Sequence, residues 1–198
     1  MSKDGRSLSR RRSAGFSLLE LAVVVLITVV ISIIALPNVV NVVSNARLRG
    51  GATNLSGLLQ NCRMLAVKEN KTKSTHFTVM TNGAVAFVKN AGDTSNITRN
   101  DPQVQLGSPL HKKDPPLGTG APPILAQSDL GFTASNSDPS FTPGGLPCLY
   151  SSGSCTNSGF VFYFFDTRPM GQSGWAAVSI SPAGRLGRWF WNGSAWSQ

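Results

Sequence analysis

One stretch of the sequence, from Phe16 to Leu36, contains twenty-one residues and a single charged side chain, Glu20. A helix of that length rises about 30 Å, which matches the hydrocarbon core of a bilayer. Residues 1–15 hold five Lys and Arg against one Asp, and positive charge stays on the cytoplasmic side of a membrane. We therefore expect residues 16–37 to be the transmembrane N-terminal half of a long helix in the inner membrane. The chain after Pro37 would then lie in the periplasm.

Glu20 needs an explanation, because an acidic side chain inside a membrane costs roughly 2.5–3.5 kcal/mol. In one interpretation its carboxylate reaches the nearby cytoplasmic interface and has no further role. In the other it pairs with an amino group at the same depth. The small residues "SAG" precede the apolar run, whereas the cleavage site of an ordinary secretory signal follows it. Cleavage after Gly15 would remove a basic leader, residues 1–15, and create an α-amino group on Phe16, about 6 Å from Glu20 along a helix.

The sequence Gly15-Phe16-Ser17-Leu18-Leu19-Glu20, followed by an apolar helix with Pro37, resembles the N-terminal signature of type IV pilins and type II secretion pseudopilins. This resemblance implies that a prepilin peptidase cuts between Gly15 and Phe16 and methylates the new amino group. It also implies that Glu20 guides the stacking of subunits into a filament. The remaining partners would be other pilin or pseudopilin subunits and the inner-membrane assembly platform.

Beyond the apolar run, residues 38–71 have the pattern of an amphipathic helix. Pro37 removes one helical hydrogen bond, so we expect a kink or a loosened turn near it and count it with Glu20 among the assembly residues. Apolar residues then recur at spacings of three and four, which predicts one face on a core: Leu55, Leu58, Leu59, Cys62, Leu65 and Ala66. Cys62 fits there as a small buried hydrophobe. The helix should end around residues 68–71, where Lys side chains suit its negative end.

Residues 72–198 change to the period of β-strands. "THFTVM" and "AVAFVK" around Asn82-Gly83 predict a hairpin with a two-residue turn, and "RWFW" and "SAW" around Asn192-Gly193 predict another. "GFVFYFFD" and "WAAVSIS" predict two further strands. Residues 91–128 hold six prolines and predict a long irregular excursion, either a contact surface or a tolerated insertion. The expected fold is α+β, a long N-terminal helix packed on an antiparallel β-sandwich-like body.

The remaining chemistry-bearing residues favour an exported, non-catalytic protein without metal or cofactor. Cys148 and Cys155 bracket a short polar loop and are expected to form a disulfide. His76 and His111 stand apart in the sequence, and neither Cys-x-x-Cys nor His-x-x-x-His spacing occurs. The sequence also contains no nucleophile elbow and no phosphate-binding loop, which argues against an enzyme.

The C-terminal part, "SPAGR" followed by "LGRWFWNGSAW", is similar to the GspH/FimT group of minor pseudopilins. That resemblance implies a minor subunit that primes or forms part of a type IV pilus or a type II secretion pseudopilus, and the choice between the two machines stays open. A major pilin is less consistent with so β-rich a body.

The alternative is a filament-borne subunit that binds DNA during uptake. DNA-binding members of the group carry Gly-Arg-x-Arg, whereas here Gly187 separates Leu186 from Arg188. Arg185 and Arg188 are therefore candidate DNA contacts if a bulge or turn at Gly187 brings them to one side. The tryptophans that follow could offer flat surfaces for stacking.

Overall fold

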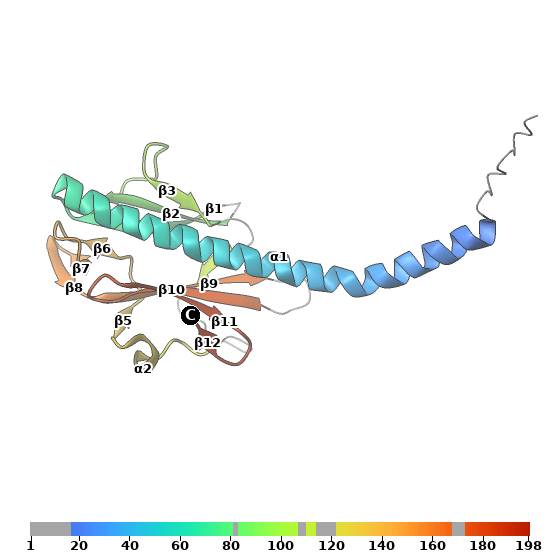
Figure 1. Ribbon diagram of the computed structural model, residues 1–198. Coiled ribbons are helices and arrows are strands. Elements are labelled where there is room, and N and C mark those ends of the chain that lie inside the picture. The colour runs from blue at the N-terminus through green and yellow to red at the C-terminus, as the bar shows by residue number, and fades with distance from the viewer. Residues whose placement is uncertain (1–16, 81–82, 107–109, 114–121, 168–172) are drawn as a thin grey trace, which may run out of the picture. The chain divides into compact units, whose positions relative to one another are not determined.

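A computed structural model of the chain describes residues 17–80, 83–106, 110–113, 122–167 and 173–198 (Figure 1). The chain divides into two units, residues 1–40 and 41–198, and one helix, α1 (Leu18–Glu69), belongs to both. The α+β class with antiparallel sheets is confirmed.

The end of α1 agrees with the sequence pattern. The helix ends at Glu69 because Asn70 adopts a positive φ of 51°, a conformation that Asn tolerates better than most residues. The N–H of Lys71 then donates to the carbonyl of Ala66 at 3.1 Å, and that of Asn70 to Val67 at 3.3 Å. These bonds satisfy carbonyls that would otherwise be left open at the end of a helix.

The body, residues 41–198, contains two six-stranded sheets. The first has the order β3-β2-β1-β6-β7-β8, and the second has the order β12-β11-β10-β9-β4, with β5 added beside β9. The strands of the first sheet are β1 (Lys73–Met80), β2 (Gly83–Asn90), β3 (Gln103–Gln105), β6 (Ser140–Phe141), β7 (Pro147–Ser151) and β8 (Ser154–Asn157). Those of the second are β4 (Leu110–Lys113), β5 (Ala134–Ser135), β9 (Gly159–Thr167), β10 (Ser173–Ile180), β11 (Leu186–Trp191) and β12 (Trp196–Ser197). Only the short β5–β9 pair is parallel among the strand pairs of the described residues.

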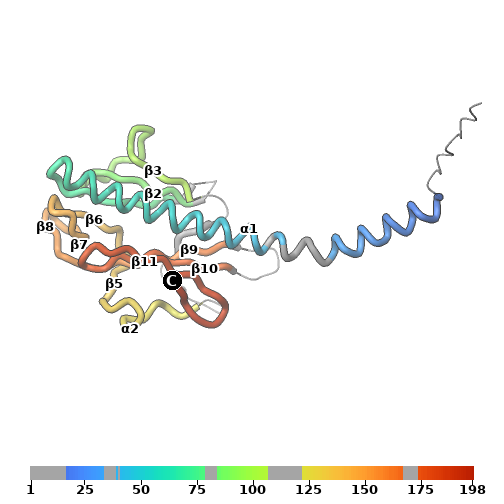
Figure 2. Tube along the Cα trace, viewed as in Figure 1, coloured from blue at the N-terminus to red at the C-terminus, as the bar shows by residue number. Residues whose placement is uncertain are grey.

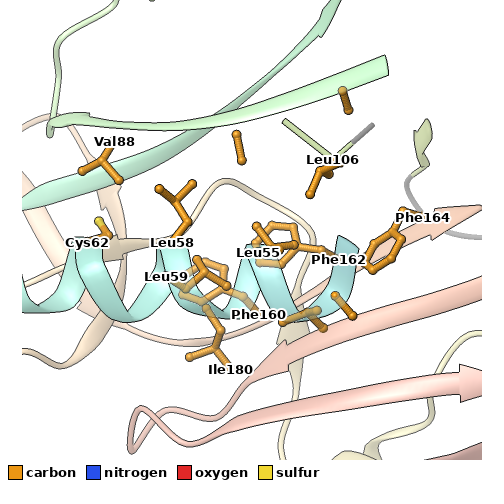
Figure 3. Close-up of a cluster of buried hydrophobic side chains, with 14 of the residues drawn as sticks. Leu55, Leu58, Leu59, Cys62, Val88, Leu106, Phe160, Phe162, Phe164 and Ile180 are labelled. Carbon is orange, nitrogen blue, oxygen red and sulfur yellow. The ribbon is translucent and has the colours of Figure 1, made fainter. Parts of the chain in front are cut away.

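The main core of the body lies between the two sheets and the part of α1 that follows residue 47. Figures 1 and 2 show β1–β3 on one side of this part of α1 and β9–β11 on the other. Alternate residues of β9, the aromatic Phe160, Phe162 and Phe164, point to this core and are buried. The predicted apolar face of the helix is there too: Leu55, Leu58, Leu59 and Cys62 are fully or nearly fully buried (Figure 3), and so is Ala66.

Two turn predictions need correction. In the first hairpin Met80 pairs with Gly83, so the connection is residues 81–82 and not Asn82-Gly83, and these two residues lie outside the described part. In the last hairpin Trp191 pairs with Trp196, which leaves a four-residue connection in place of a tight turn. Its shape is set locally, because Asn192 Oδ1 accepts the N–H groups of Ser194 and Ala195 at 2.9 and 2.8 Å.

The prediction of an irregular excursion over residues 91–128 is wrong in part. The segment supplies β3 to the edge of the first sheet and β4 to the second, and it contains the short helix α2 (Gln127–Leu130). Its first half is fixed through Lys89, whose buried ammonium lies 3.3 Å from Asp101 and 2.7 Å from the hydroxyl of Ser95. The N–H of Thr98 donates to Asp101, which lowers the pKa of that carboxyl.

The predicted disulfide between Cys148 and Cys155 is confirmed. It joins β7 to β8, the hairpin in which Ser151 pairs with Ser154, and the two Cα atoms are 5.4 Å apart. The loop is therefore clamped at the edge of the first sheet.

Candidate functional site

The first candidate site is the start of α1. Ser17 caps the helix: its hydroxyl oxygen accepts the N–H of Glu20 at 3.2 Å, and its carbonyl accepts the N–H of Leu21 at 3.1 Å. Glu20 stands in the first turn, where the positive end of the helix dipole favours a carboxylate. Sequence reasoning missed this local role, although Ser-x-x-Glu before an apolar run is the signal for it. Gly15 and Phe16 lie outside the described residues.

The apolar side chains that follow are exposed to solvent. From Leu18 to Ile33, large aliphatic residues are between 49% and 87% exposed. The polar side chains among them bond to their own helix: Thr28 donates to the carbonyl of Val25 at 2.8 Å, and Ser32 to that of Thr28 at 2.7 Å. This stretch therefore presents an apolar surface whose hydroxyls have partners within the helix.

In the described part of the chain, no helix meets the combined length and apolarity that crossing a membrane requires. The backbone of Pro37 is helical, whereas its side chain and those of residues 34–36 and 38 are outside the described part.

The second candidate site is the C-terminal arginine pair. The condition of a bulge at Gly187 is not met, because β10 and β11 pair without interruption from Ile180–Leu186 to Ala176–Phe190. Glycine is needed there for another reason: a Cβ would lie 2.6 Å from Ser179 Oγ, the acceptor of the Trp189 Nε1–H bond. Arg185 belongs instead to the turn before β11, where its N–H and carbonyl bond to Ser181.

Arg188 lies on the face of β11 that meets α1. Its Nη1 donates to the hydroxyl of Thr53 on that helix at 3.2 Å, and it remains exposed. Arg49, one helical turn before Thr53, places its guanidinium 5.5 Å from the centre of the Phe190 ring. The structure thus brings Arg49 beside Arg188, a neighbour that sequence spacing could not reveal because 139 positions separate the two.

The tryptophans of this hairpin do not form a free stacking platform. Trp189 is buried with Val161, Tyr163 and Ala177 in a second apolar cluster. Trp196 is held from two sides, since its Nε1–H donates to the carbonyl of Pro123 at 2.7 Å and its ring lies 5.6 Å from that of Trp191. The expectation of exposed aromatic surfaces is wrong for Trp189, which covers a core.

The remaining titratable residues of interest are His76 and Cys62. His76 is not isolated, because Nδ1 lies 3.4 Å from a carboxylate oxygen of Asp138; the side chain of His111 is outside the described part. Within the described ranges, no group of three or more His, Cys, Asp or Glu is placed to hold a metal ion. Burial raises the pKa of Cys62 to about 11, so its thiol stays protonated and unreactive at neutral pH.

Comparisons with protein-family models, with curated proteins and with solved structures found no match. The family membership implied by the N-terminal motif therefore stays a prediction.

Proposed function

We propose that the chain is a non-catalytic, membrane-anchored filament subunit, a minor pilin or pseudopilin of the GspH/FimT type. It would prime, or form part of, a type IV pilus or a type II secretion pseudopilus. The observation that carries the proposal is the exposed apolar surface of α1 from Leu18 to Ile33, with a single acid, Glu20, in its first turn.

An apolar surface of this length is stable only when something covers it. Lipid would cover it while the subunit waits in the inner membrane, and the helices of neighbouring subunits would cover it in the filament. The hydrogen bonds of Thr28 and Ser32 to their own helix support both states, because neither hydroxyl needs water. The proposal also includes the expected arrangement of the fold: a long N-terminal helix whose first half is the membrane anchor and whose second half packs on a β-sandwich-like body.

Glu20 then has two duties in the proposal. In the single chain it suits the positive end of α1. In the filament it would pair with the amino group that a prepilin peptidase creates on Phe16 of a neighbouring subunit. That pairing would remove the cost of burying both charges.

Processing provides the direct test. In cells that assemble the filament, mass spectrometry of the purified filaments should find this chain beginning at Phe16 with a methylated amine. Gly15→Val should block cleavage, because a peptidase site at glycine has no room for a branched side chain. Gly5→Val, a matched change within the leader, should be processed normally. Filament-borne chains that begin at Met1 would refute the proposal.

DNA binding is a second candidate function, and one observation favours it. Arg49 on α1, Arg185 in the turn before β11 and Arg188 on β11 are exposed, and no carboxylate pairs with them in the described part of the chain. Exposed cations without carboxylate partners are suited to phosphates, whatever the base sequence. Stacking on aromatic rings contributes less here, because Trp189 is buried.

The DNA candidate predicts a steep dependence of binding on salt. For the body, residues 41–198, the double variant Arg185→Gln with Arg188→Gln should lower the slope of log K against log salt by about 1.8, since each phosphate contact contributes about 0.9. Binding would be measured by fluorescence anisotropy with duplex DNA at several salt concentrations. The control double variant, Lys71→Gln with Arg99→Gln, removes the same number of positive charges and should keep the slope of log K against log salt. If the body does not bind DNA at low salt, or the two double variants behave alike, the candidate is eliminated.

A further inference from the structure

A groove on the described body lies along the last turns of α1. It has a volume of about 620 Å³. One wall is a stripe of α1, and the other comes from the turn before β11, from β11 itself and from β6. The lining residues are Leu59, Gln60, Arg63, Met64, Val67, Lys68, Phe141, Gly184 and Leu186.

The groove combines an apolar floor with cations at its edge. Met64 is 64% and Val67 53% exposed, so two large apolar side chains of the helix meet solvent there. Arg63 and Lys68 add two positive charges, and the lining contains no carboxylate.

The side chain of Arg63 lies close against two glycines at the groove. A Cβ on Gly145 would lie 3.1 Å from Arg63 Nε, and one on Gly184 would lie 3.3 Å from Arg63 Nη1. Both glycines have positive φ, 77° and 81°, so both turns pass close to the guanidinium. Arg63 forms no ion pair within the described residues, which leaves its charge available to a ligand.

We propose that this groove binds an extended peptide segment of another protein in which apolar and acidic residues alternate. Apolar side chains would fill the floor at Met64 and Val67, and carboxylates would meet Arg63 and Lys68. The amide side chain of Gln60, which both donates and accepts, suits a peptide group better than a lipid tail. A second copy of this chain is a poor occupant, because residues 16–198 alone still carry a net charge of +5, from 13 Lys and Arg against 8 Asp and Glu.

The size of the groove sets the length of the segment. From Leu59 to Lys68 the helix rises about 14 Å, which corresponds to about four residues of extended chain. A six-residue peptide of alternating leucine and glutamate therefore covers the groove with one residue to spare at each end. Its leucines and glutamates alternate along the chain, so the leucines can meet Met64 and Val67 while the long side chains of Arg63 and Lys68 reach the neighbouring glutamates.

The test uses the full chain in nanodiscs of zwitterionic phosphatidylcholine and a fluorescein-labelled form of this peptide. Fluorescence anisotropy should show saturable binding that is absent with empty nanodiscs. Arg63→Gln with Lys68→Gln, and separately Val67→Asp, should each weaken binding by about tenfold or more. Arg47→Gln with Arg99→Gln removes the same charge elsewhere and should leave the affinity within about twofold. A peptide with a photoreactive leucine should cross-link to residues 59–68 or 184–186.

Three results would overturn the proposal. The first is no saturable binding of the peptide, and the second is equal weakening by the groove pair and the control pair. The third is binding that does not depend on the peptide's apolar side chains. It would appear as undiminished binding when the peptide's leucines are replaced by serine, or as displacement of the peptide by duplex DNA or by anionic vesicles at matched charge. The third result would mean that the cations alone attract any polyanion. Circular dichroism of each variant separates lost binding from lost folding.

Discussion

Glu20→Ala and Glu20→Gln are expected to leave a folded, membrane-inserted and correctly cleaved protein that fails to enter filaments. Without the carboxylate, the amino group of Phe16 in a neighbouring subunit would be buried in an apolar surrounding without a partner. A buried charge of this kind costs roughly 2.5–3.5 kcal/mol, which lowers incorporation on the order of a hundredfold. The measurement is the ratio of filament-bound to membrane-bound subunit on immunoblots of fractionated cells.

The glutamine variant separates the two duties of Glu20. Glutamine serves almost as well as glutamate at the third position of a capped helix, so Glu20→Gln keeps the local structure while removing the charge. Ser17→Ala does the reverse: it removes the hydroxyl that accepts the Glu20 N–H, at a cost of about 1 kcal/mol, and keeps the charge. Glu69→Gln changes the same kind of side chain at the other end of α1 and should assemble normally. If Glu20→Gln assembles like the wild type, pairing of Glu20 with an amine is refuted.

Phe162→Ala should produce the largest loss of stability among single changes in the body, about 3–5 kcal/mol. Phe162 is fully buried at the centre of β9, its ring lies 5.0 Å from that of Phe77, and it belongs to the cluster that joins both sheets to α1. Removing the ring leaves a cavity, because the two sheets and α1 cannot move together far enough to fill it. Guanidinium unfolding of residues 41–198, followed by circular dichroism, measures the change.

Two further variants make this stability prediction specific. Phe162→Leu keeps most of the buried volume and should lose clearly less than the alanine variant. Leu149→Ala removes an apolar side chain from β7 that is 38% exposed, and should cost less than about 1 kcal/mol. Equal losses for Phe162→Ala and Leu149→Ala would contradict the central place of Phe162 in the core.

Local patterns in the sequence were sufficient for most elements of the fold. The three-and-four spacing of Leu55, Leu59 and Cys62 predicted a buried helix face, and all three side chains are buried. The strand patterns of residues 159–166, 175–181 and 188–191 predicted β9, β10 and β11, and the short spacing of Cys148 and Cys155 predicted their bond. The cap at Ser17 was also readable, through Ser-x-x-Glu. Each of these features depends on residues within a few positions of one another, so the chain sequence determines them directly.

Contacts between distant segments were decided only by the tertiary structure. Residues Gln103–Gln105 became a strand by pairing with β2, and residues Leu110–Lys113 by pairing with β9. Both segments lie in a proline-rich stretch whose own sequence has little strand character. Packing of β11 on α1 placed Arg188 against Thr53, 135 positions away. The groove beside Arg63 likewise exists because Gly184 and Phe141 reach the helix from two different sheets. Such contacts depend on which surfaces bury one another most fully when the sheets and the helix come together, and no stretch of neighbouring residues contains that information.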